Sequence, residues 1–365
     1  MSSLLITGGA GFIGANFVKY WRRHHPSDRV IVLDAMTYAA QPASLAVFDD
    51  DSSVRLVRGN ICDQGLVEAL LEEEAIKRIV HFAAESHVDR SISGPDPFIE
   101  TNITGTHTLL KAARNCWSDS EFSGCRFHHT STDEVYGSLK PDEPPFTESS
   151  QYAPNSTYSA SKAASDHLVR AYNKTYGLPV TTSNCSNNYG PLQFPEKLIP
   201  LAITNLLNGK PIPVYGDGMN VRDWLHVNDH CRGIDAVLTH GQTGHTYNIG
   251  GDREETNIAL INTLCNVLDE LFETYPAYAE HYHLAPPANG VKCQDLITYV
   301  QDRPGHDRRY AIDATKVKQE LGFDPETQFE DGLKDTARWY LDNSAWWQPI
   351  LDSSYQPDSL AVAHS

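Results

Sequence analysis

The chain has 365 residues, of which 40% are hydrophobic and 21% are charged, and its formal net charge is −18. This length allows two domains, or one large domain with a cap. The negative charge argues against nucleic acid as a partner, because phosphate backbones need a basic surface. No apolar run approaches the ~18 residues of a membrane span, so no membrane partner is expected.

The N-terminal residues and the cysteines indicate a reducing compartment. Residues 1–7 lack a basic region and run directly into a strand pattern, which is unlike a cleaved signal peptide, and a cytoplasmic protein is expected. The seven cysteines are scattered and include no CxxC pair, so reduced thiols are expected. The 16 histidines form no HExxH motif and no spaced Cys/His set, so no metal site is predicted.

Short apolar runs alternate with amphipathic stretches through the first half of the chain. The predicted strands are 4–7, 29–34, 54–58, 78–83, 126–130 and 180–185, and the predicted helices are 66–75, 98–116 and 156–176. This alternation predicts an α/β fold, a Rossmann-type doubly wound parallel sheet with helices on both faces.

A glycine-rich turn follows the first predicted strand and opens a helix. Gly8, Gly11 and Gly14 have the spacing GxxGxxG. Such a turn brings the backbone and a helix N-terminus close to a pyrophosphate. Asp34 ends the second strand, where a carboxylate accepts hydrogen bonds from an adenosine ribose and repels a 2′-phosphate, so NAD is predicted rather than NADP. The alternatives are a simple tight turn and a solvated strand-end carboxylate.

Two further motifs supply candidate catalytic groups. Tyr158 and Lys162 lie at i and i+4 of a predicted helix, so the ammonium, with an oxidised nicotinamide, would lower the pKa of the phenol toward that of a general base. Thr132, Asp133 and Glu134 follow the strand at 126–130, where ligands bind in open α/β sheets. Simple oxidation needs only one base, so the two carboxyl groups indicate additional acid–base chemistry. The alternative is a capped or salt-bridged turn.

Longer motifs extend over residues 4 to about 340. They are HFAAESHVDR at 81–90, STDEVYG at 131–137, NNYGPLQFPEKLIP at 187–200, VRDWLHV at 221–227 and DRPGHDRRY at 302–310. These motifs resemble those of the extended branch of the short-chain dehydrogenase/reductase superfamily, and in particular those of the dTDP-glucose 4,6-dehydratases. One departure is Asn60, in Gly59-Asn60-Ile61-Cys62, where that family usually has aspartate; an adenine contact of altered strength is still expected.

The resemblance implies an NAD-dependent hydro-lyase that converts dTDP-D-glucose to dTDP-4-keto-6-deoxy-D-glucose. Tyr158 would remove the 4-hydroxyl proton as C4 is oxidised, with Thr132 hydrogen-bonded to that hydroxyl. Glu134 would then remove the C5 proton, and Asp133 would protonate the departing 6-hydroxyl before hydride returns to C6. Asp133 must therefore hold a proton near neutral pH, so a raised pKa is predicted.

The resemblance also implies the binding residues and a homodimer. The NAD set is Gly8, Gly11, Phe12, Ile13, Gly14, Asp34, Ala35, Met36, Thr37, Asn60, Ile61, Phe82, Ala83, Ala84, Thr101, Tyr158, Lys162 and Asn188. The nucleotide-sugar set is Ser86, Thr132, Asn187, Lys197, Leu198, Pro213, Val214, Tyr215, Arg222, Asn257, Asp302, Arg303 and His306. Arg222 and Arg303 suit the diphosphate, because guanidinium groups match phosphate oxygens.

The pattern changes after about residue 190, where prolines become frequent. Residues 1–190 are predicted to form the NAD-binding Rossmann domain, to which residues of about 220–255 can return. Residues 191–345 are predicted to bind mainly the nucleotide sugar, with a surface excursion at 275–290. A C-terminal tail is predicted at 346–365, and for residues 343–365 the sequence leaves an ordered arm and a frayed tail open.

Other functions stay open at this point. A 4,6-dehydratase acting on UDP or GDP sugars would carry the same motifs. A 4-epimerase of the same branch lacks the Asp-Glu pair, so Asp133 and Glu134 disfavour it. A protein of a different class, a non-catalytic NAD sensor, need not keep these carboxyl groups or the Tyr158–Lys162 pair. The downstream sugar pathway is not encoded in these motifs.

Overall fold

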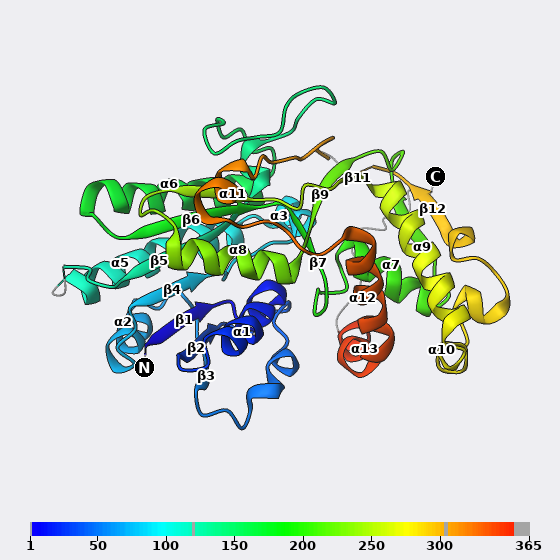
Figure 1. Cartoon of the computed structure of the whole chain (residues 1–365), viewed down its shortest axis with the longest axis horizontal. Helices are drawn as coiled ribbons and strands as arrows, with labels where there is room; N and C mark the ends of the chain where they lie inside the picture. The colour runs from blue at the N-terminus through cyan, green and yellow to red at the C-terminus, as the bar shows by residue number, and fades with distance from the viewer. Residues whose placement is uncertain (1, 119–120, 303–305, 354–365) are drawn as a thin grey trace.

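A seven-stranded parallel sheet forms the larger lobe of the computed structural model, which describes residues 2–118, 121–302 and 306–353 (Figure 1). The strand order is β10-β6-β5-β4-β1-β2-β3. The bounds are β1 Ser3–Thr7, β2 Arg29–Asp34, β3 Val54–Arg58, β4 Arg78–His81, β5 Arg126–Thr132, β6 Val180–Cys185 and β10 Thr246–Ile249. The predicted Rossmann-type sheet and its six predicted strands are confirmed, and β10 pairs with β6 as a seventh.

Two strand ends differ from the prediction, and both lie at the carboxyl edge of the sheet. β4 ends at His81, two residues early. β5 continues to Thr132, because Ser131 and Thr132 pair in register with Asn184 and Cys185 of β6. The extension adds the polar residues Ser131 and Thr132 to the sheet. The prediction ended this strand at residue 130 because it followed the apolar run.

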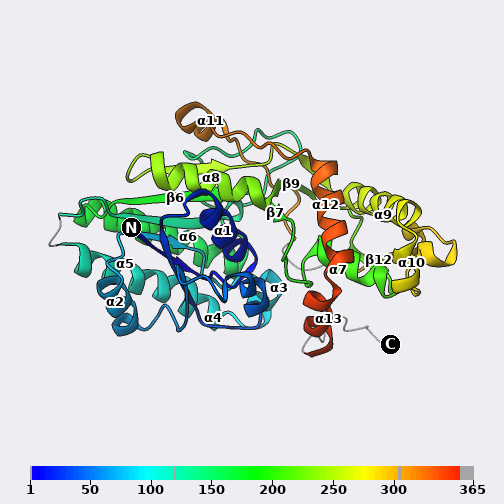
Figure 2. The same ribbon diagram turned by 60° about the horizontal axis from the view of Figure 1, so that its bottom comes forward.

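Helices cover both faces of the sheet. Successive strand residues point to opposite faces, and apolar side chains on both faces need to be buried. Leu4 and Ile6 pack toward α1 (Phe12–His24), α8 (Val227–His240) and α11 (Thr315–Leu321). Leu5 points to the other face, which α2 (Gln64–Glu73), α5 (Thr106–Trp117) and α6 (Thr157–Tyr176) cover. Figure 2 shows α8 on the side of the strands opposite to α2 and α5.

The predicted helices are confirmed, with one irregular segment. The stretch at 98–116 consists of the short α4 (Asp96–Phe98), a π-helical segment at Ile99–Gly105 and then α5. The Asn102 side chain, within the π-helical segment, accepts from the Glu85 backbone N–H at 2.8 Å and donates to the Glu85 carbonyl oxygen at 3.0 Å. π-Helical turns often occur at functional sites, and this one fixes the loop after β4.

The smaller lobe has its own apolar core and follows residue 190 in the chain. Its helices are α7 Leu198–Leu207, α9 Asn257–Thr274, α10 Ala277–His281, α12 Phe329–Asp342 and α13 Ser344–Ser353, with a parallel pair of strands β8 Ile212–Tyr215 and β12 Ile297–Val300. A three-stranded sheet of β7 Asn187–Tyr189, β9 Val221–His226 and β11 Glu254–Thr256 joins the lobes, and α3 (Val88–Ser93) lies after β4. Within the described residues, no helix is long and apolar enough to cross a membrane.

Two C-terminal segments are more ordered than their composition suggested. The predicted surface excursion at 275–290 is only partly correct, because Tyr282 is buried and its hydroxyl donates to the Leu341 carbonyl oxygen at 2.6 Å. Residues 344–353 form α13, with Trp347 buried and its indole N–H donating to the Tyr340 carbonyl oxygen at 2.8 Å. The tail predicted at 346–365 is therefore helical up to residue 353, and its remaining residues, 354–365, lie outside the described residues.

Replacing Trp347 by alanine should destabilise the smaller lobe. Trp347 is 1% exposed, and loss of a buried aromatic side chain costs about 3–5 kcal/mol. Urea unfolding followed by tryptophan fluorescence measures the change in the free energy of unfolding. Tyr299→Ala, at a position 58% exposed, is the control, and equal stability of the two variants would contradict the packing of α13.

Candidate active site

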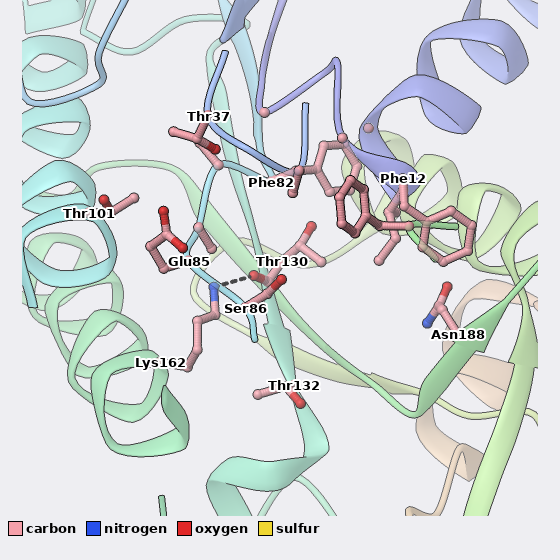
Figure 3. Close-up of a pocket in the computed structure, with 18 of the residues that line it drawn as sticks. Phe12, Thr37, Phe82, Glu85, Ser86, Thr101, Thr130, Thr132, Lys162 and Asn188 are labelled. Carbon is pink, nitrogen blue, oxygen red and sulfur yellow. Dashed lines mark hydrogen bonds between the residues drawn. The ribbon is translucent and has the colours of Figure 1, made fainter. Parts of the chain in front are cut away.

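A cavity of about 350 Å³ lies where six parallel strands end. Its lining includes residues at or after the ends of β1, β2, β3, β4, β5 and β6, which is the edge where open α/β sheets bind ligands. The predicted residues that line it are Gly8, Gly11, Phe12, Ile13, Gly14, Asp34, Ala35, Thr37, Asn60, Ile61, Phe82, Ala83, Ala84, Ser86, Thr101, Thr132, Asp133, Glu134, Tyr158, Lys162, Asn187, Asn188 and Lys197. In Figure 3, Phe12, Phe82 and Asn188 lie on the side opposite Thr101 and Lys162.

The three glycines of the first turn have different structural tasks. Gly8 has φ +70°, and a Cβ there would lie 2.6 Å from the Ala83 backbone nitrogen. A Cβ on Gly14 would lie 2.2 Å from the Gly8 carbonyl oxygen, so only glycine lets α1 pack this closely. Gly11 is the N-cap of α1 and provides no side-chain cap, which leaves the first amide groups of the helix available to an anion.

Asp34 holds the loop after β2 against this turn. One carboxylate oxygen accepts from the Ala10 amide and the other from the Met36 amide, both at 2.9 Å. Burial raises the pKa of Asp34. Each carboxylate oxygen has a second acceptor site, which fits a ribose diol. The turn, the helix N-terminus and Asp34 therefore fit the NAD that the motif predicted.

α6 brings Tyr158 and Lys162 to the cavity. Ser156 caps the helix by accepting from the Ser159 amide, in a reciprocal capping box, and thereby fixes where the first turn begins. The Lys162 ammonium donates to the Thr130 carbonyl oxygen at 2.8 Å (Figure 3). Burial lowers the pKa of Lys162, and Asp166, one helical turn further, opposes this effect.

The pKa of Tyr158 is displaced upward in this structure, opposite to the direction that Lys162 and an oxidised nicotinamide together would give. Burial raises the pKa of Tyr158 well above its ordinary value, and the negative charge of Glu134 adds to the effect. A hydrogen bond with the Thr132 side chain acts in the opposite direction. The Lys162 ammonium is directed to a backbone carbonyl oxygen and not to the phenol. Ionisation of the phenol therefore depends more on the positive charge of an oxidised nicotinamide than on Lys162.

Thr132, Asp133 and Glu134 occupy the turn at the end of β5. The Thr132 hydroxyl accepts from the Glu134 amide at 3.3 Å and donates to Asp133 Oδ1 at 3.3 Å. Asp133 is 2% exposed. Burial raises the pKa of Asp133 well above its ordinary value, Glu134 and Asp223 raise it further, and Arg222 acts in the opposite direction. The predicted raised pKa of Asp133 is therefore confirmed.

Part of the predicted nucleotide-sugar set lies away from the cavity lining. Leu198, Pro213, Val214, Tyr215, Arg222, Asn257, Asp302 and His306 lie in the smaller lobe or the joining sheet, and Arg303 is outside the described residues. The Arg222 guanidinium lies 4.4 Å from the Tyr310 ring centroid and donates to the Val221 and Asp307 carbonyl oxygens. Met36, from the NAD set, packs against the apolar core instead of lining the cavity.

Several lining residues were missed by the sequence reasoning. The polar and aromatic ones, with Cys185, are Glu85, Thr130, Ser131, Cys185, Ser186, Gln193, Phe194 and Glu196, and the others are Leu33, Ala39, Ala40, Gly59 and Val88. Thr130, Ser131 and Cys185 lie at the carboxyl ends of predicted strands, and the strand-end rule could have found them. Glu196 had no such signal: it is buried beside Tyr38 and His87, residues more than 100 positions away in sequence.

Known proteins resemble this chain along nearly its whole length. The GDP-mannose 4,6 dehydratase family matches residues 5–336. A dTDP-glucose 4,6-dehydratase of Xanthomonas campestris pv. campestris is 52% identical over 99% of both chains. Two solved dTDP-glucose 4,6-dehydratases share the fold. The one from Streptomyces venezuelae, with NAD and TYD bound, has 48% sequence identity and a TM-score of 0.84, and the match covers 95% of this chain and 99% of that one. The one from Bacillus anthracis, in complex with NAD, has 43% identity and a TM-score of 0.82, and the match covers 96% of this chain and 100% of that one. The chain belongs to the dTDP-glucose 4,6-dehydratase family.

Proposed function

We propose roles for the cavity residues in the reaction of this family. The chain is an NAD-dependent nucleotide-sugar 4,6-dehydratase that converts dTDP-D-glucose to dTDP-4-keto-6-deoxy-D-glucose and water. The observation that carries this function is the pair of carboxyl groups, Asp133 and Glu134, which lines the same cavity as Tyr158, Lys162 and the glycine turn. An epimerase or an NAD sensor has no use for a buried acid and a second carboxyl group at this place.

The part of the cavity around the glycine turn would hold NAD. The amide groups at the start of α1 would hold its pyrophosphate, and the Asp34 carboxylate would accept hydrogen bonds from its adenosine ribose. When bound, NAD would supply the hydride acceptor for C4 of the sugar and, once reduced, the hydride donor for C6. Phe12, Phe82, Thr101 and the other predicted residues that line the cavity enclose it.

Tyr158 is the base for the 4-hydroxyl proton. Its phenol needs nearby positive charge to ionise, because burial raises its pKa. Lys162, with its ammonium fixed on the Thr130 carbonyl oxygen, provides part of this charge. Thr132 hydrogen-bonds the substrate hydroxyl and orients it toward the phenol.

Asp133 and Glu134 divide the elimination between them. Asp133, whose pKa is raised well above its ordinary value by burial, acts in its protonated form and donates its proton to the departing 6-hydroxyl. Glu134 takes the C5 proton, which the neighbouring C4 ketone acidifies, and returns it to C5. Two adjacent carboxyl groups in different protonation states are the usual way for one site to hold both an acid and a base.

The nucleotide sugar extends from the cavity toward the smaller lobe. Ser86, Asn187 and Lys197 line the cavity near the sugar, and the Lys197 ammonium donates to the Ser86 carbonyl oxygen at 3.1 Å. The dTDP part lies toward Leu198, Pro213, Val214, Tyr215, Arg222, Asn257, Asp302, Arg303 and His306. Arg222 meets the diphosphate after exchanging its carbonyl partners for phosphate oxygens.

The protein acts as a cytoplasmic homodimer. Ile92 and Ile99 are 51% and 45% exposed, on elements that pack against α6, and they support an apolar contact there. Light scattering of the purified protein should give twice the mass of the 40.6-kDa chain.

An assay with dTDP-glucose and NAD tests the function directly. The expected product is a 4-keto sugar that absorbs in alkali, formed without net reduction of NAD. UDP-glucose and GDP-mannose serve as competing substrates, and faster turnover of either would assign a different nucleotide. A product that keeps all its hydroxyl groups would indicate epimerisation instead.

Replacing Glu134 by glutamine should stop removal of the C5 proton. The amide keeps the shape of the side chain and cannot act as a base, so kcat should fall by about 10²–10⁴-fold. Deuterium incorporated at C5 from D₂O, measured by NMR, should fall with kcat. The control is Glu143→Gln, at an exposed position. Unchanged C5 exchange in the Glu134 variant would assign the base to another group.

Replacing Asp223 by asparagine should move the alkaline limb of the pH profile to lower pH. Asp133 acts in its protonated form, so elimination is lost as the pH rises through the pKa of Asp133. The Asp223 carboxylate raises the pKa of Asp133, and its removal lowers that pKa. The profile of kcat against pH measures the limb, with the exposed Asp217→Asn as control. A limb that stays in place or moves to higher pH would show that Asp133 does not set it.

A further inference from the structure

Proton balance in the proposed reaction leaves two residues in the wrong state after each turnover, so this inference rests on the proposed function. The 4-hydroxyl proton ends on Tyr158. The proton that leaves in water comes from Asp133. Glu134 takes a proton from C5 and returns it, so it is unchanged. One proton must therefore pass from Tyr158 to Asp133 before the next substrate can react.

Thr132 lines the same cavity as these two residues. Its hydroxyl donates to Asp133 Oδ1 at 3.3 Å, and it is near enough to Tyr158 for hydrogen bonding to lower the pKa of that phenol. A hydroxyl is both a donor and an acceptor, so it can receive one proton as it gives up another. Thr132 is itself 7% exposed and is held at the end of β5 by the ladder with β6 and by the Glu134 amide.

The other groups near Asp133 are poorly suited to supply the proton. The Asp223 carboxylate accepts from the Gly251 and Arg253 amides at 3.0 and 2.7 Å, and as a carboxylate it is an acceptor only. The Arg222 guanidinium retains its protons at any physiological pH. Asp133 is 2% exposed, so bulk water has little access to it.

We propose that the Thr132 hydroxyl returns the proton from Tyr158 to Asp133 and so resets the site after each turnover. The phenol O–H bond of Tyr158 breaks as its proton bonds to Thr132 Oγ1. At the same time the former Thr132 proton bonds to Asp133 Oδ1. The products are a Tyr158 phenolate, a neutral Asp133 carboxylic acid and an unchanged threonine, so no proton is exchanged with solvent.

The geometry of Asp133 suits this relay. Its Oδ1 is held by Thr132, while its Oδ2 is buried and has no hydrogen-bond partner among the described residues. Rotation about the last side-chain bond, which is broadly two-fold for aspartate, exchanges the two oxygens. A proton received from Thr132 can thus be presented to the 6-hydroxyl.

Thr132→Val tests the relay, because valine keeps the branched shape on a strand and removes the hydroxyl. Single-turnover and multiple-turnover rates of 4-keto product formation are measured by rapid quench with dTDP-glucose. The first turnover needs no reset, although it loses the hydrogen bond to the substrate. The ratio of first-turnover to steady-state rate should rise by about ten-fold or more over that of the parent. Acetate or imidazole buffer should accelerate the slow steady state in proportion to its concentration, because a small buffer molecule that enters the cavity takes the proton of Tyr158 and gives one to Asp133.

Thr132→Ser is the matched control, because it restores a hydroxyl at the same place, and its ratio should stay close to that of the parent. Thr132→Ala gives the same comparison as valine if the second methyl group disturbs the pocket. Equal slowing of both phases in the valine and alanine variants would overturn the relay and leave Thr132 a role in oxidation alone. A slow steady state that does not respond to buffer would also overturn it. Failure of the parent to form any 4-keto product would instead refute the proposed function.

Discussion

Removal of the Asp133 carboxyl group from water is the constraint on which the rest of the site depends. β5 continues to Thr132 because its last residues pair with β6, and the next residue then enters the interior between the sheet and the joining strands. A carboxylate there loses its hydration, so the neutral acid is favoured. In the proposed mechanism this raised pKa is what lets Asp133 act as the acid beside Glu134, the base.

The same burial sets the conditions for Tyr158. An isolated phenol in this cavity would stay protonated, since burial and the charge of Glu134 both raise its pKa. Lys162 cannot offset this alone, because its own pKa is lowered by burial and its ammonium is bound to a carbonyl oxygen. Ionisation of the phenol therefore becomes coupled to an oxidised nicotinamide. In the proposed mechanism, Tyr158 therefore becomes a base only when the hydride acceptor is in place.

Local patterns made most of the larger lobe predictable. Apolar runs, the glycine spacing of Gly8, Gly11 and Gly14, and the Tyr158–Lys162 spacing depend on neighbours within a few turns or one strand, and the structure has each of them where expected. The arrangement around Arg222 could not be derived in this way. It depends on Tyr310 and Asp307, which approach from a segment about 85 residues away. The π-helical segment and the buried Glu196 likewise depend on long-range packing and not on a period in the sequence.

The acidic character of the cavity bears on how it accepts anionic ligands. The chain carries a net charge of −18, and carboxyl groups line the space where diphosphates bind. Burial raises the pKa of Asp34, Glu85, Asp133 and Glu196, because it disfavours the charged form of each carboxyl group. Attraction then comes from local donors, namely the amides at the start of α1 and the cations of Lys162 and Lys197. Burial of Asp133 therefore favours the neutral form that the proposed elimination needs, while the amides and lysines supply the local attraction for a nucleotide diphosphate.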